Sequence, residues 1–170
     1  MRFIITALLA AAVVMATPTK TPEDSPSNIG KRAIHTVWVG KSFSPDQVQA
    51  NIGDEVEFHF LPGVFSVVES SYTNPCHWNG GFVSTNVLTN TDKRENSFAF
   101  VVTIRDNKPL WFYNGASDYC MKGAVGAINS PEDRDKSVFG YYRAAKTEEY
   151  SDNPSEPKGG RWILTEKLTH

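Results

Sequence analysis

Apolar and polar residues alternate along much of the chain between residues 33 and 131. In DEVEFHFL (54–61) every second residue from Val56 is apolar, and the residues between, including Glu57 and His59, are polar. Successive side chains of a strand point to opposite faces, so this pattern predicts a half-buried strand with His59 on its solvent face. Similar short segments follow, separated by Pro, Gly, Asn and Asp: IHTVWVG (34–40), FSVVES (65–70), SFAFVVTI (97–104), PLWFYN (109–114) and AVGAIN (124–129). The spacing predicts an all-β domain, an antiparallel sandwich or barrel of roughly seven or eight strands over 33–131.

The pattern changes in residues 132–170. SVFGYYRAAKTEEY (137–150) has apolar residues at helical spacing, behind Asp135 and Ser137 as possible caps, and predicts a short amphipathic helix on the edge of the sandwich. SDNPSEPKGG (151–160) is typical of a loop or linker, and RWILTEKL (161–168) could add an edge strand.

The N-terminus predicts export. MRFIITALLAAAVVMA (1–16) combines an early arginine with a short apolar run, which favours a secretory signal peptide over a membrane anchor and places the protein outside the cell. Residues 17–32, TPTKTPEDSPSNIGKR, are rich in Pro, Thr and Ser and predict a disordered lead-in. Lys31-Arg32 could be a dibasic processing site or a plain solvated pair.

Charge and cysteine content narrow the options further. The formal net charge is −2 and no basic block occurs, so neither nucleic acid nor an anionic membrane is indicated as a partner, and no later segment has the length of a membrane span. In an oxidising compartment, Cys76 and Cys120 most simply form one disulfide. No convergent catalytic constellation is visible, so we expect a protein that is not an enzyme.

Three motifs in a fixed order resemble one known family. They are HTVWVG with FSPDQVQANIGDEVEFHF (35–60), SSYTNPCHWNGGF (70–82) and LWFYNGASDYCMKGAVGAIN (110–129). The chain resembles the secreted fungal cupredoxin-like proteins, often called extracellular serine-rich proteins, which are relatives of plastocyanin and the phytocyanins. The resemblance implies a cupredoxin-like Greek-key β-sandwich, here followed by a short C-terminal helix and an extended tail. It also implies the disulfide between Cys76 and Cys120.

The same resemblance places the four ligands of a type-1 copper site at Phe65, Asn114, Tyr119 and Ala124. Such a site needs a thiolate, two imidazoles and a weak axial ligand. Phe65 and Ala124 have no donor atom, Asn114 lacks the thiolate charge, and a phenol such as Tyr119 is protonated at neutral pH. The sequence therefore predicts a degenerate copper site with no metal and no cofactor.

Three hypotheses about function follow. The first is a metal-free secreted cupredoxin-like protein that binds a partner, whether a protein, a glycan or a small molecule; Trp78, in the predicted loop CHWNGGF, is the aromatic residue expected to be exposed. The second is an extracellular copper-binding electron-transfer protein with unusual ligands; a site at Cys76 and His77 would require breaking the disulfide. The third is an accessory protein of a secreted or metabolic pathway that holds a small molecule in the vacated pocket.

Overall fold

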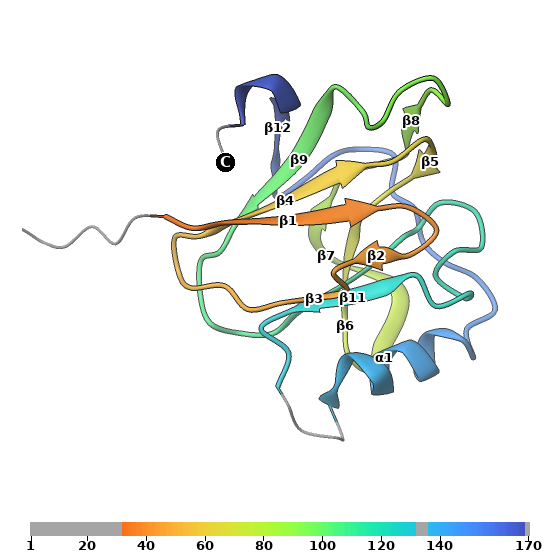
Figure 1. Cartoon of the computed structure of the whole chain (residues 1–170). Helices are drawn as coiled ribbons and strands as arrows, with labels where there is room; N and C mark the ends of the chain where they lie inside the picture. Colours follow the sequence, from red (N-terminus) through yellow and green to blue (C-terminus); the bar gives the residue numbers. More distant parts are fainter. Residues whose placement is uncertain (1–31, 132–135, 169–170) are drawn as a thin grey trace, which may run out of the picture. The chain divides into compact units, whose positions relative to one another are not determined.

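The structure, a computed structural model, describes residues 32–131 and 136–168. Within these residues the chain forms two five-stranded sheets, a two-stranded sheet and one α-helix (Figure 1). The predicted signal peptide, nearly all of the predicted lead-in and His170 lie outside the described residues. No helix in the described ranges is long and apolar enough to cross a membrane.

The first sheet has the strand order β12-β9-β4-β1-β2. Its strands are β12 (Arg161–Leu164), β9 (Phe98–Thr103), β4 (Glu55–Phe60), β1 (Ile34–Val39) and β2 (Phe43–Ser44). The second sheet has the order β3-β11-β10-β6-β7. Its strands are β3 (Gln47–Val48), β11 (Val125–Ile128), β10 (Leu110–Tyr113), β6 (Val68–Ser71) and β7 (Asn74–Val83). The remaining strands, β5 (Gly63–Phe65) and β8 (Val87–Thr89), pair with each other.

The sandwich differs from the prediction in two respects. It contains more strands than expected, because short strands such as β2 and β3 form and the Gly-rich segment CHWNGGF, predicted as a loop, is part of β7. It is also not purely antiparallel: β1 pairs with β4, and β3 with β11, in parallel. Parallel neighbours require a crossover, and between β1 and β4 the chain supplies one by passing through β3 of the other sheet.

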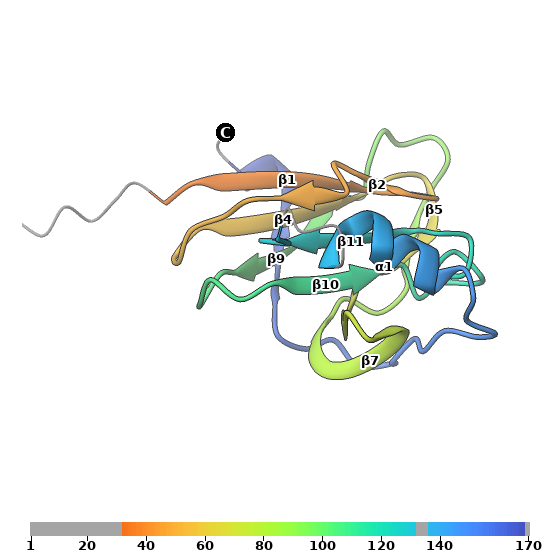
Figure 2. The ribbon, with the colours of Figure 1, turned by 90° about the horizontal axis from the view of Figure 1, so that it is seen from below.

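The main core lies between the two layers that Figure 2 shows from below. Phe58 of β4 is opposite Val37 of β1 and Phe100 of β9 in the strand register, and all three side chains are fully buried. The ring of Phe112 from the opposite sheet meets Phe58 edge-on, with centroids 5.3 Å apart. The apolar face predicted from the alternation is therefore confirmed as the core face.

The opposite face of β4 corrects the sequence interpretation. Glu57 and His59, expected to face solvent, are buried, with 0% and 3% of their surfaces exposed. The imidazole of His59 lies between two carboxylates: Nε2 is 3.2 Å from Glu57 Oε2 and Nδ1 is 2.6 Å from Glu95 Oε2. The ring of Trp38 packs against it, with centroids 5.2 Å apart. Paired carboxylate and imidazole groups make this burial tolerable.

The predicted C-terminal helix is present as α1 (Val138–Ala145). The Ser137 side chain accepts a hydrogen bond from Gly140 N, the N-cap arrangement that the sequence indicated. The helix contacts β11 and β7 on the outer face of the second sheet, as Figure 2 shows. Tyr141 is fully buried there beside Trp111, forming a second apolar cluster.

The tail after α1 returns to the sandwich. Lys158 and Val83 exchange backbone hydrogen bonds, and β12 then pairs with β9 as an edge strand. The ring of Trp162 packs on Phe60 and Phe100, at centroid distances of 5.9 and 5.1 Å. The segment predicted as a loop or linker is thus fixed to the domain at both ends.

Candidate functional site

The four positions that correspond to copper ligands lie together. Phe65 ends β5, Asn114 follows β10, and Ala124 precedes β11 at the other end of the loop that carries Tyr119. Asn114 N donates to Ala124 O at 2.9 Å, and Ala124 N donates to Tyr119 O at 2.9 Å. We refer to Phe65, Asn114, Tyr119 and Ala124 as the Asn114 cluster.

Asn114 connects three stretches of backbone. Its side chain is fully buried, and its Oδ1 accepts hydrogen bonds from Ser66 N and Ala116 N, both at 3.0 Å. Its Nδ2 donates to Gly40 O at 2.9 Å. Both ends of the amide are therefore used by main-chain groups, and no lone pair or proton of Asn114 is directed at an open coordination position.

Aromatic rings fill the rest of the cluster. Phe65 is 3% exposed and belongs to the main core, and the half-buried Tyr119 packs against it with ring centroids 5.4 Å apart. The ring of Phe65 also lies against Gly63, where an added Cβ would come within 2.8 Å of it. Residues of the protein thus occupy the space between these positions, and the packing gives no support to a small molecule held there.

This donor set does not fit a type-1 copper ion. A thiolate and two imidazoles are required, whereas the cluster supplies an amide already bonded to the backbone, a phenol, a phenyl ring and a methyl group. Elsewhere, within the described ranges of the chain, no group of three or more His, Cys, Asp or Glu side chains is arranged to hold a metal ion.

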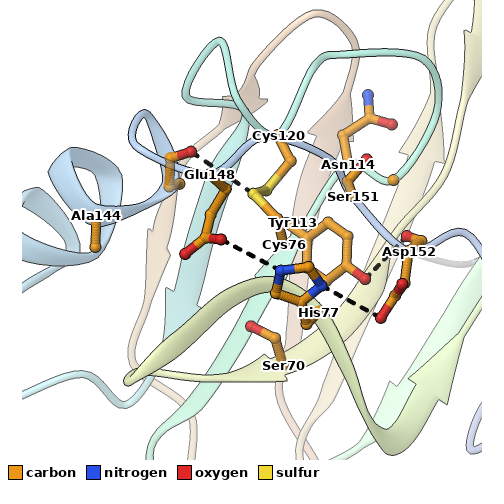
Figure 3. The surroundings of a disulfide bond; sticks show 12 residues. Ser70, Cys76, His77, Tyr113, Asn114, Cys120, Ala144, Glu148, Ser151 and Asp152 are labelled. Atoms are coloured by element: carbon orange, nitrogen blue, oxygen red, sulfur yellow. Dashed lines mark hydrogen bonds and ion pairs between the residues drawn. A yellow bond between two sulfur atoms is a disulfide. The ribbon is translucent and has the colours of Figure 1, made fainter.

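The predicted disulfide is confirmed: Cys76 and Cys120 are bonded, and both are fully buried. It joins β7 to the loop of the Asn114 cluster, and Cys76 Sγ lies 3.8 Å from Ala145 O of α1 (Figure 3). No free cysteine is present in the described part of the chain. A metal site that uses Cys76 would have to break this bond, as the sequence analysis argued.

His77, next to the disulfide, fastens the C-terminal tail. Its Nε2 lies 3.2 Å from Glu148 Oε2 and its Nδ1 lies 3.5 Å from Asp152 Oδ2 (Figure 3). The ring of Tyr150 meets the imidazole edge-on, with centroids 4.7 Å apart. Carboxylates from both sides of one tail segment therefore hold His77, which assigns it a structural contact that the sequence pattern did not reveal.

Two buried tyrosines complete this region. The hydroxyl of Tyr113 donates to Asp152 O at 2.9 Å. Burial raises the pKa of Tyr113 far above its usual value, and the nearby Asp152 carboxylate raises it further. Burial also raises the pKa of Tyr141, whose hydroxyl is hydrogen-bonded to Ser70. Neither phenol is placed to ionise and act as a base or a metal ligand near neutral pH.

Trp78 is not the exposed aromatic residue that the sequence predicted. It is half-buried, its indole N–H donates to Gly81 O at 3.0 Å, and Lys158 Nζ lies over its ring at 5.2 Å. Exposed aromatic side chains occur instead at other places, among them Phe98 and Trp162, which are 45% and 37% exposed. The tail crosses Trp78 at a sequence distance that local pattern cannot show.

Comparison with known proteins assigns the family. No protein-family model matches the chain. The chain is 33% identical over 121 residues to an extracellular serine-rich protein of Arthroderma benhamiae, a match that covers 71% of this chain and 47% of that protein. It is 26% identical over 121 residues to a probable GPI-anchored cupredoxin-1 of the same organism, covering 71% of this chain and 61% of that protein. The chain is a homologue of fungal cupredoxin-like proteins.

The cupredoxin-like chain thus spans about half the length of the curated relatives it matches. Among solved structures it is similar to two pseudoazurins. One, from Sinorhizobium, is 17% identical with a TM-score of 0.38, and the match covers 70% of this chain and 85% of that one. The other, from Methylobacterium extorquens, is 20% identical with a TM-score of 0.37, covering 69% and 86%. The mostly β-sheet sandwich with a short C-terminal helix is the cupredoxin-like fold expected from the sequence motifs.

Proposed function

We propose that this cupredoxin-like protein is secreted, does not hold copper at the family site, and acts as a non-catalytic binding or accessory protein. The observation that carries the proposal is the bonding of Asn114. Its amide is buried and makes three hydrogen bonds to backbone groups of three separate stretches of chain. This residue does the work of holding the loops together that a metal–thiolate bond would do in a copper protein, and it does so without an ion.

Secretion is supported by the relatives, one described as extracellular and one as GPI-anchored, and by the N-terminal sequence. A buried disulfide fits an oxidising compartment.

Apolar side chains that remain exposed support the binding part of the proposal. Leu88, Phe98 and Trp162, with the amides of Asn86 and Asn96, line a cleft of about 390 Å³. Trp162 is held rigidly by its contacts with Phe60 and Phe100. A fixed aromatic ring beside amide groups suits a sugar or a peptide segment, since it offers an apolar face at little entropic cost.

The deciding experiment is a copper titration of the purified, secreted protein. We expect no intense visible thiolate-to-copper band with Cu(II), no copper retained after gel filtration, and no rise in melting temperature with stoichiometric copper. A blue protein, or tightly retained copper, would refute the loss of the metal site and favour the electron-transfer hypothesis.

Binding is tested separately with neutral oligosaccharides. Trp162 fluorescence should respond to a ligand in the cleft, and a Leu88→Ser variant should weaken that response. Phe139→Ser is the matched control, because Phe139 is equally exposed, at 67% against 68% for Leu88, and lies on α1 away from the cleft. Equal binding by both variants would show that the cleft is not the site.

A further inference from the structure

The start of the first strand has features that the proposed function does not use. The basic pair Lys31-Arg32 is followed at once by Ala33. The sheet begins there: Glu55 N donates to Ala33 O at 3.0 Å, and β1 continues from Ile34. Arg32, Ala33 and Ile34 are all exposed. The basic pair therefore stands at the boundary between the polar lead-in and the sandwich, accessible to an enzyme.

The backbone nitrogen of Ala33 faces a buried carboxylate. Ala33 N lies 2.9 Å from Asp54 Oδ1, and Asp54 Oδ2 accepts from Asn51 N at 2.8 Å and lies 3.2 Å from His35 Nε2. A neutral acceptor would satisfy a peptide N–H. A carboxylate in this place suits an ammonium group much better, because charge-assisted hydrogen bonds are roughly twice as strong as neutral ones.

We propose that the protein is processed between Arg32 and Ala33, and that the new α-ammonium group of Ala33 binds Asp54. The reaction is hydrolysis of the Arg32–Ala33 peptide bond: water supplies the oxygen of the new Arg32 carboxylate, and the Ala33 nitrogen takes a proton. The enzyme is an endoprotease of the secretory route that cuts after Lys-Arg. The inference rests on the secretion in the proposed function, and is independent of copper.

The charges around this point are prepared for the loss of Arg32. In the uncut chain Glu55 Oε1 contacts two guanidinium groups, Arg32 at 2.9 Å and Arg161 at 2.6 Å. Removing Arg32 leaves Glu55 paired with Arg161. The cation that departs from Glu55 is replaced by the ammonium beside Asp54, so the two neighbouring carboxylates keep the same number of positive partners before and after cleavage.

A second Lys-Arg pair provides an internal comparison. Lys93-Arg94 is also exposed, in the loop between β8 and β9. The residues after it are pinned: Glu95 contacts His59 at 2.6 Å, and Asn96 N donates to Phe60 O at 2.8 Å. A short loop held at both ends cannot extend into a protease cleft, whereas the lead-in before Ala33 has only one end attached. Cleavage is therefore expected at Arg32 and not at Arg94.

The first experiment is N-terminal sequencing and intact-mass measurement of the full-length chain secreted by a host with a Lys-Arg-specific endoprotease. Wild type and the control Arg94→Gln should begin at Ala33, and Arg32→Gln should begin upstream, near residue 17. A wild-type protein that begins upstream, or one cut at Arg94 as readily, overturns the proposal. Met1 retained on the protein would overturn secretion as well, whereas copper binding would refute only the loss of the metal site.

The second experiment tests the ammonium–carboxylate contact in the cut protein. The ¹³C methyl shift of Ala33 follows titration of its amino group, which has a pKa of about 8 in an unstructured chain. The Asp54 and Glu55 carboxylates raise the pKa, and Arg161 and protonated His35 lower it. With Asp54 in direct contact, we expect a midpoint above 8 in wild type and a clear fall in Asp54→Asn. Equal midpoints in the two proteins would overturn the contact.

Discussion

Replacement of Asn114 by alanine tests the central structural claim. The substitution removes one buried amide and cuts three hydrogen bonds, to Ser66 N, Ala116 N and Gly40 O. All three backbone groups belong to buried residues, so none gains a full hydration shell in exchange.

The expected cost follows from what is left behind. An orphaned buried donor or acceptor costs about 1–3 kcal/mol, so three of them give an upper value of several kcal/mol. The space vacated by the amide is polar and has three groups ready to bind a water molecule, which would recover part of the loss. We therefore expect the free energy of unfolding to fall by about 2–4 kcal/mol.

The assay is urea unfolding of the disulfide-intact protein, followed by the fluorescence of the buried Trp111. Asn114→Ala should lower the midpoint and leave the slope unchanged, because the surface exposed on unfolding is the same. Asn107→Ala is the matched control: Asn107 lies in an exposed loop, so its loss should change stability by no more than about 0.5 kcal/mol.

A loss of less than about 1 kcal/mol for Asn114→Ala would refute the reasoning, since it is no more than the net contribution of a single ordinary hydrogen bond. The three stretches would then be held by their other contacts, and the claim that Asn114 does the work of a metal bond would fall.

Three further predictions concern the same domain. Converting the Asn114 cluster to two histidines, a cysteine and a methionine at the family positions should create an intense visible band with Cu(II), whereas Asn114→Cys alone should stay colourless because both imidazoles are still missing; colour in the single variant would contradict this. Replacing both Cys76 and Cys120 by alanine opens a loop with a sequence separation of 44 and should cost about 4 kcal/mol in the chain-entropy model, measured by the same unfolding assay. The backbone N–H of Asn51 is the main cause that lowers the pKa of Asp54 below its ordinary 3.8, so its stabilisation is complete above pH 3.8 and is lost as the pH falls through the lowered pKa; Asp54→Asn should flatten this acid limb of a stability–pH curve.

Local sequence pattern predicted the core of the fold well. The alternation through Val56 and Phe58 identified the buried face of β4, because a strand places every second side chain on the same side whatever its neighbours are. The helix at Val138–Ala145 was predicted for a similar reason: its apolar spacing and its Ser137 cap are both local.

What the pattern missed depends on residues far apart in sequence. The burial of His59 requires Glu95, which approaches from a loop 36 positions later. The cover over Trp78 comes from Lys158 in the tail. Motif order did place the Asn114 cluster in one region, but the hydrogen bonds of Asn114 to the backbone of Gly40 and Ser66 have no signature in side-chain type, since any residue offers the same main-chain groups.

The position of β12 also has a consequence for biosynthesis. Because Arg161–Leu164 forms the edge of a sheet whose other strands begin at Ile34, that sheet stays open until nearly the whole chain has left the ribosome. The ion pair between Arg161 and Glu55 spans 106 positions, so it is among the last contacts that synthesis allows. Until then β9 presents an unpaired edge and Phe100 lacks the cover of Trp162, which are the features that recruit chaperones or foreign strands. A nascent chain of this protein is therefore most vulnerable to misassembly in the interval just before its final residues emerge.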